Sequence, residues 1–174
     1  MWQVLLAAIT MSMLVGSSAH AEGWEVTRRF DEFTDEPVVS ARVTNDRGDD
    51  LLVVCDDEEN LISIYAPRRQ ILGEEFAVRY RVDKNPVVSS EMAWRNANGR
   101  AETSFVTKRS LFGDGPQEGQ NAEFLNLLSA IMEGSTFVIE AGEERAKFLL
   151  RGSRDAISEA MTACGVSFAS EPQS

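Results

Sequence analysis

Histidine is almost absent from this chain, and its absence excludes several kinds of active site. The single histidine, His20, lies in an apolar N-terminal segment that we expect to be removed. The rest of the chain then has no imidazole for Ser-His-Asp or Cys-His catalysis, for a histidine-containing zinc site, or for haem held by histidine. The few lysines, Lys84, Lys108 and Lys147, do not stand in an S-x-x-K pattern, so a Ser-Lys mechanism is not indicated either.

Basic residues are also in short supply. The chain has 17 Lys and Arg residues against 28 Asp and Glu residues, a formal net charge of −11. A nucleic-acid-binding protein needs a basic face to neutralise phosphates, so this balance argues against nucleic acid as a partner. It permits a cationic partner, although an acidic surface also serves solubility.

Long hydrophobic runs are confined to the N-terminus. Residues 1–14 carry no charged side chain, and small residues lead from there to Ala19-His20-Ala21, just before Glu22. The run is too short to span a bilayer stably. The small residues that follow it predict a signal peptide over residues 1–21 that is cut after Ala21. An uncleaved anchor is the alternative, since the segment has no Lys or Arg. No later run is long enough to cross a membrane, so we expect a periplasmic protein without stable membrane insertion after cleavage.

Cysteine occurs only twice, at Cys55 and Cys164. Two cysteines in an exported chain most often pair, and closing so long a loop is worth about 4–5 kcal/mol in the chain-entropy model. A reactive thiol is the alternative. Cys55, however, ends the apolar run Leu51–Cys55, and a buried strand is the wrong environment for a reactive thiolate. We therefore expect a disulfide that closes the domain.

Short alternating segments fill much of residues 22–168, which we take as a single β-rich domain. Leu51–Cys55 is apolar on both faces and is expected to be a central buried strand. Asn98-Gly99 predicts a type I′ hairpin. The spacing of strands and turns is typical of an antiparallel sandwich or barrel-like sheet. Strands are predicted around residues 24–30, 37–43, 51–55, 61–65, 76–82, 88–94, 103–105, 137–139 and 148–150.

Two segments have helical periodicity instead. The first carries an apolar stripe from Phe124 to Met132, with Asn121 expected as its cap and Gly134 as its C′ residue. The second begins at Gly152 and the expected cap Ser153, and ends at Gly165. Its predicted buried face is Ala156, Ile157, Ala160, Met161 and Cys164. The fold class is therefore α+β, mostly antiparallel β, with two helices, the last one C-terminal, and residues 169–174 form a disordered tail.

Arg79, Arg81 and Asp83 are the main candidate binding residues. They alternate with apolar residues and are expected to share one face of the strand at residues 76–82. A guanidinium there can grip a carboxylate, whereas a cross-strand ladder of ion pairs is the structural alternative, which we favour. Trp94 is a further candidate, with a place in the core as its alternative.

The acidic turns predict no metal site. Asp56–Glu59 with Asp46, Asp49 and Asp50 can be seen as a carboxylate cluster, but the EF-hand spacing is absent and a solvated turn explains the residues. No cofactor is expected. Arg47-Gly48-Asp49 spells an adhesion tripeptide, although Gly-Asp is ordinary turn chemistry. No carboxylate pair stands out for glycoside hydrolysis, so we assign no catalytic residue.

The order of several short motifs is informative. Trp24 is followed by L-x-V-x-C ending at Cys55, by Y-R-x-D ending at Asp83, and by Trp94. F-x-L-x-G from Phe148 to Gly152 and the helical Cys164 complete the order. This order resembles the type VI secretion-associated periplasmic accessory proteins (VasI/TagO-like). The resemblance implies a non-enzymatic envelope protein with a Cys55–Cys164 disulfide, and makes Arg81, Asp83 and Trp94 motif positions without a role.

Three functions fit the sequence. The leading hypothesis is a soluble, non-enzymatic periplasmic binding or accessory protein with a protein partner in the cell envelope or cell wall. The second is an inhibitor or immunity-type protein that blocks a basic enzyme such as lysozyme with an acidic face. The third is a cell-wall hydrolase that uses carboxylates.

Overall fold

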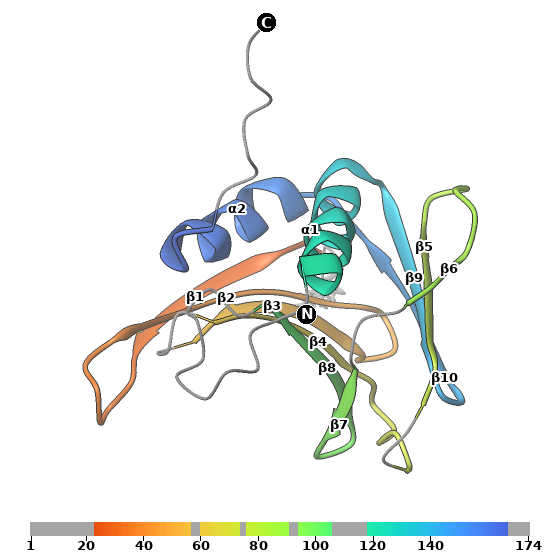
Figure 1. Ribbon diagram of the computed structural model, residues 1–174, viewed down its shortest axis with the longest axis horizontal. Coiled ribbons are helices and arrows are strands. Elements are labelled where there is room, and N and C mark those ends of the chain that lie inside the picture. The colour runs from red at the N-terminus through yellow and green to blue at the C-terminus, as the bar shows by residue number, and fades with distance from the viewer. Residues whose placement is uncertain (1–22, 57–59, 74–75, 91–93, 106–117, 167–174) are drawn as a thin grey trace, which may run out of the picture.

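The computed structural model describes residues 23–56, 60–73, 76–90, 94–105 and 118–166 (Figure 1). The predicted signal peptide, the predicted tail at 169–174 and Asp57–Glu59 of the acidic turn lie outside these ranges. Within them, no helix is long and apolar enough to cross a membrane.

The strands form two antiparallel sheets. The six-stranded sheet has the order β1-β2-β3-β4-β8-β7 and the four-stranded sheet the order β10-β9-β5-β6. The fold class is confirmed as α+β, mostly antiparallel β. The strands are β1 (Glu25–Phe30), β2 (Pro37–Thr44), β3 (Asp50–Cys55), β4 (Leu61–Ala66), β5 (Val78–Val82), β6 (Val88–Ser89), β7 (Arg95–Ala97), β8 (Arg100–Phe105), β9 (Thr136–Ala141) and β10 (Glu144–Leu149).

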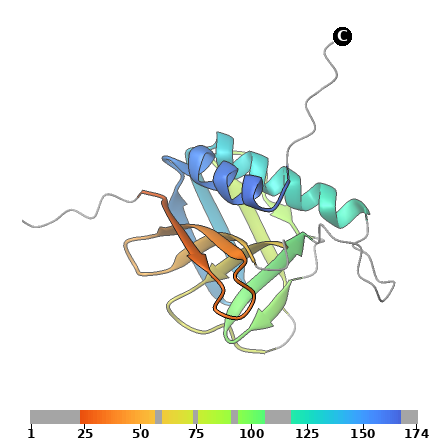
Figure 2. The ribbon, with the colours of Figure 1, turned by 90° about the vertical axis from the view of Figure 1, so that its left-hand side faces the viewer.

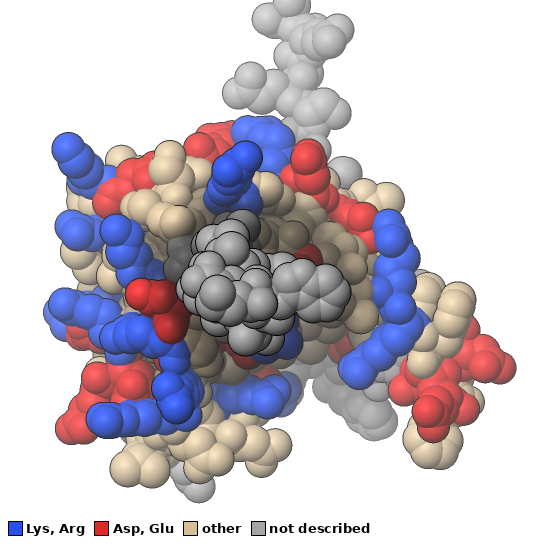
Figure 3. Space-filling model, turned by 180° about the vertical axis from the view of Figure 1, so that it is seen from behind, with Lys and Arg blue, Asp and Glu red and all other residues tan. Residues whose placement is uncertain are grey.

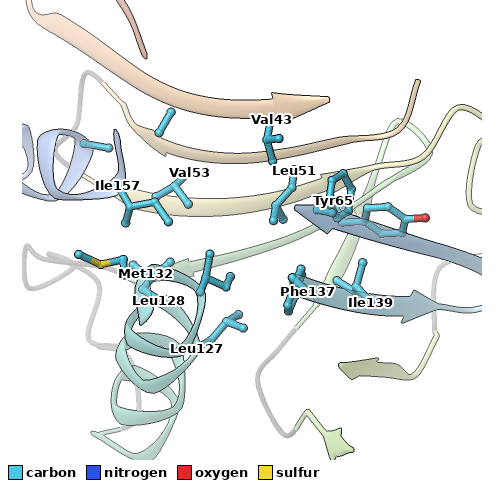
Figure 4. Packing of buried hydrophobic residues seen from close by; sticks show 14 of the residues in the cluster. Val43, Leu51, Val53, Tyr65, Leu127, Leu128, Met132, Phe137, Ile139 and Ile157 are labelled. Carbon is cyan, nitrogen blue, oxygen red and sulfur yellow. The ribbon is translucent and has the colours of Figure 1, made fainter. Parts of the chain in front are cut away.

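Both helices lie on one face of the six-stranded sheet. Helix α2 (Ser153–Ala163) packs on β2 and β3, and α1 (Glu118–Glu133) lies beside it (Figures 1 and 2). The four-stranded sheet stands at a steep angle beside the helices. One core fills the space between these layers, as Figure 4 shows. It takes side chains from both sheets and both helices, including Leu51, Val53, Tyr65, Leu127, Leu128, Phe137, Ile139 and Ile157.

The position of β3 is central, but the strand is buried on only one face. Leu51, Val53 and Cys55 point into the core, whereas Leu52 and Val54 lie half-buried on the opposite face. The expectation of burial on both faces is therefore wrong for these two residues. The reason is that the helices cover only one side of the sheet.

The predicted disulfide is present. Cys55 at the end of β3 is bonded to Cys164 at the end of α2, with the two Cα atoms 5.5 Å apart. Both residues are buried in the core. A disulfide of this kind indicates an oxidising compartment outside the cytoplasm.

One predicted strand is much shorter than expected, since only Val88–Ser89 of residues 88–94 form a strand among the described residues. Residues 88–94 do not form a single strand, because the chain leaves the four-stranded sheet after β6 and enters the other sheet at β7. Met92 of that prediction lies outside the described residues. The following hairpin is confirmed, since Asn98 and Gly99 join β7 to β8 with φ of 55° and 83°, the positive values that a type I′ turn requires.

The helix ends differ from the expected caps. Helix α1 begins at Glu118, so Asn121 is inside it and is not its cap. Gly134 does not take a left-handed φ; its glycine is needed for space, because a Cβ there would overlap Cγ1 of Val82. Gly152 occupies the cap position of α2, while the buried Ser153 hydroxyl donates instead to the Ile131 carbonyl at 2.9 Å.

Candidate functional site

The outer face of the four-stranded sheet gathers basic side chains. Strand β5 turns Val78, Tyr80 and Val82 into the core and leaves Arg79 and Arg81 exposed. Strand β10 likewise turns Ala146 and Phe148 into the core and leaves Arg145 and Lys147 exposed. We call the five residues Arg79, Arg81, Lys84, Arg145 and Lys147 the basic face. In Figure 3 basic side chains crowd the left of the molecule, the side on which this sheet lies.

The first row of the basic face is a closed set of ion pairs. Glu140 on β9 is paired in register with Arg79 on one side and Arg145 on the other. One carboxylate oxygen accepts from Arg79, and the other accepts from Nε of Arg145 at 3.0 Å. These hydrogen bonds, first from Arg79 and then from Arg145, hold the pKa of Glu140 below its ordinary value. The ion-pair ladder that we favoured is therefore present at Arg79.

The second row has two cations that form no ion pair in the described residues, although Asp83 lines a hollow together with both. Arg81 and Lys147 are both in register with Val138 of β9, which is half-buried between them. Within the described part of the chain, no carboxylate forms an ion pair with either cation. Strands in a sheet lie about 4.8 Å apart, so the two backbones are roughly 10 Å apart and both long side chains can reach the space above Val138. This row can accept an anionic group.

Asp83 lines that hollow of the basic face together with Arg81, Lys84 and Lys147, but its carboxylate is held by the backbone. It has a φ of 53° and begins the turn after β5. Its carboxylate accepts from the backbone N–H groups of Thr136 at 2.8 Å and Ser135 at 3.1 Å. These bonds, led by the one from Thr136, lower the pKa of Asp83. Asp83 therefore lies near Arg81, while the turn directs its carboxylate to the backbone at the start of β9.

Trp94 lies on the other side of the sheet. Its indole N–H donates to Oγ of Ser90 at 2.9 Å, and that hydroxyl donates to Glu123 of α1 at 2.9 Å. Tyr80, which points inward from β5, also hydrogen-bonds Glu123, and burial followed by that carboxylate's charge raises the pKa of Tyr80 to about 12. The structure thus ties Trp94 to α1 through Ser90, apart from the basic face.

A second hollow opens on the basic face beside Val138. Its volume is about 250 Å³. The first-row residues and Arg81 line this hollow. The hollow also exposes apolar surface, including the side chain of Val87, which is 59% exposed. Our sequence interpretation missed Lys84, Arg145 and Lys147 as members of this site, although the alternation of Arg145 and Lys147 along β10 was a usable signal. The lining residues are Arg79, Tyr80, Arg81, Val87, Val138, Glu140 and Arg145.

The Arg47-Gly48-Asp49 tripeptide is structural. Asp49 is buried and accepts from the backbone of Arg68 at 2.9 Å and from the Asn45 amide at 2.9 Å. The Arg47 guanidinium donates to the Arg145 carbonyl. The tripeptide therefore holds the turn after β2 against β10, and its aspartate is not exposed for adhesion.

The acidic turns do not converge within the described residues. Asp50 pairs with Arg42 and accepts from the Thr44 hydroxyl, on the sheet face opposite to Asp49. No group of three or more Asp, Glu, His or Cys side chains that could hold a metal ion occurs in the ranges that the structure covers. The chain matches no protein-family model, no curated protein and no solved structure.

Proposed function

We propose that this protein is a periplasmic, non-enzymatic binding or accessory protein of the cell envelope. Its partner is a protein, and it binds an acidic segment of that partner through Arg81 and Lys147. The observation that carries the proposal is the second row of the basic face, whose two exposed cations form no ion pair with a carboxylate in the described residues. Guanidinium groups bind carboxylates through paired, charge-assisted hydrogen bonds, and Val138 adds an apolar contact between the two cations.

The two carboxyl groups on and beside the basic face, Asp83 and Glu140, are poorly suited to act as a general acid. A general acid near neutral pH needs a raised pKa. Asp83 and Glu140 have lowered pKa values, because hydrogen bonds and arginines stabilise their charged forms. The carboxyl groups of Asp83 and Glu140 therefore stay ionised near neutral pH, which suits a binding surface and not proton donation.

The motif order supports a place in an envelope secretion system. The resemblance to type VI secretion-associated accessory proteins rests on motifs that include Tyr80, Arg81 and Asp83. In the fold these residues have different surroundings, since Tyr80 faces α1, Arg81 faces outward and Asp83 caps the start of β9. Of the three, Arg81 is the one available to a partner. The disulfide is consistent with the periplasm.

The test is capture of cross-linked partners from envelope extracts with matched charge variants. The variant Arg81→Gln/Lys147→Gln removes both cations of the second row. The control Arg151→Gln/Arg154→Gln removes two exposed cations near the start of α2, so the net charge is the same. We expect a partner that the wild type and the control capture and the first variant loses. Capture of no partner above an unrelated acidic protein, or equal capture by all three, would overturn the proposal.

A further inference from the structure

The hairpin of β1 and β2 projects from the body of the molecule and carries exposed aromatic rings. Phe33 in its turn is 96% exposed, and Phe30 at the end of β1 is 71% exposed. Figure 1 shows the hairpin extending away from the helices, and Figure 3 shows it as the lobe at the right. A phenyl ring at such a tip has no packing partner in one copy of the described chain, so it is available to a second surface.

The hairpin holds Phe33 in a defined place. Oδ1 of Asp31 accepts from the backbone N–H of Phe33 at 2.8 Å and of Thr34 at 3.1 Å. The Asp31 N–H donates to the Glu36 carbonyl at 2.9 Å and closes the turn. A turn that is already ordered loses less conformational entropy when it binds.

The turn that carries Phe33 is acidic, although Arg28 and Arg29 precede it on β1, and the opposite end of the molecule is basic. The turn carries Asp31, Glu32, Asp35 and Glu36 around the ring. The basic face lies across the molecule on the four-stranded sheet, and offers a hollow with exposed Val87 and several guanidinium groups (Figures 1 and 3). The two surfaces are complementary in charge, yet they cannot meet within one copy.

We propose that the β1–β2 hairpin of one copy docks on the basic face of a second copy. Phe33 enters the hollow beside Val138, where guanidinium groups contact the ring face, and the acids of the turn oppose Arg81 and Lys147. The inference rests on the proposed function, because it names an acidic segment for the same face. The contact joins different surfaces of the two copies, so it repeats head to tail and forms open chains.

The association is weak. The tip of a hairpin covers less surface than a standard interface, which places the dissociation constant on the order of 10–1000 µM. Each copy has a net charge of −11, so whole copies repel one another at low salt. At physiological ionic strength the screening length is about 8 Å, which suppresses this repulsion more than the contact ion pairs.

The test is sedimentation velocity of the exported, oxidised protein over about 10 µM to 1 mM, a range that brackets the expected affinity. We expect the average mass to rise with concentration. Phe33→Ser and Arg81→Glu/Lys147→Glu should each weaken association at least about 10-fold, since each removes one side of the contact. Leu72→Ser is the matched control, because Leu72 is an exposed apolar side chain, 87% exposed, outside both surfaces.

A mixture of the two defective variants tests the direction of the contact. Phe33→Ser keeps an intact basic face, and Arg81→Glu/Lys147→Glu keeps an intact hairpin. Each alone should associate at least about 10-fold more weakly than the wild type, and the mixture should form a 1:1 dimer that cannot grow. A mixture that stays monomeric while the wild type associates would show another contact and overturn the inference.

Three further outcomes separate this inference from the proposed function. If the wild type stays monomeric at about 1 mM while capture of the envelope partner still depends on Arg81 and Lys147, self-docking is wrong and the proposed function stands. Lysozyme serves as a basic probe. If Phe33→Ser loses binding to lysozyme and the average mass of the wild type does not rise with concentration, the hairpin binds a foreign basic protein and self-docking is again wrong. If self-association follows Phe33 but no envelope partner is captured, the proposed function fails alone.

Discussion

Arg81 on β5 and Lys147 on β10 lie on either side of Val138, and within the described residues neither forms an ion pair with a carboxylate. One row away, Arg79 and Arg145 share Glu140. The same sheet face therefore carries a row whose two cations share one carboxylate, beside a row whose two cations form no ion pair in the described ranges. This contrast separates a structural ion-pair ladder from the pair of cations that we assign to binding.

Replacing Arg79 by Gln should raise the pKa of Glu140 toward its ordinary value of 4.5. The reason is that Arg79 is the largest cause of its lowered pKa. The measurement is an NMR titration of the side-chain carboxyl groups. Arg81→Gln is the control and should leave the Glu140 titration nearly unchanged, because Arg81 is paired in register with Val138. Equal shifts in both variants would contradict the division into two rows.

Removing the disulfide by Cys55→Ala/Cys164→Ala should lower the free energy of unfolding by about 4–5 kcal/mol, the value for closing a loop of about 110 residues. Urea denaturation of the wild type and the variant measures the loss. Reductant should destabilise the wild type by a similar amount and leave the variant unchanged. Detection of two free thiols by mass spectrometry in oxidised, exported protein would refute the bond itself.

Gly134→Ala should destabilise the fold by about 1–3 kcal/mol, because the added methyl group would meet Val82 in a packed interior. Thermal or urea unfolding measures the change. Ser135→Ala is the control, since Ser135 is exposed and donates only through its backbone in the contacts described. If Gly134→Ala is as stable as the control, then β5 and the end of α1 do not approach as closely as the structure shows.

The two tyrosines should ionise only at strongly alkaline pH. Burial is the main cause that raises the pKa of Tyr80 to about 12 and that of Tyr65 still further. In the unfolded chain both titrate near 10, so the unfolded state releases these protons first. Their stabilising contribution is therefore complete below about pH 10 and is lost as the pH rises through about 12. Ultraviolet absorbance should show little phenolate in folded protein at pH 10.5; normal titration there would contradict the burial of both rings.

The sequence by itself determined the local elements. Alternation along residues 76–82 and the turn chemistry of Asn98-Gly99 depend on neighbours in the chain, and both predictions hold. The Cys55–Cys164 disulfide was also predictable, because two cysteines in an exported chain have few other fates. The sequence also shows a glycine at position 134. It does not show why glycine is needed there, since Val82 approaches this position from a strand that is distant in the sequence.

The tertiary structure alone decided which of these elements became neighbours. Strand order placed β5 and β10 on either side of β9, and this brought Arg81 to Lys147 across Val138. It also sent the carboxylate of Asp83 to the start of β9. The physical reason is that register and strand order are set by how the apolar faces pack in the common core, a property of the whole chain. Periodicity shows that a residue faces outward, and only packing determines what lies beside it.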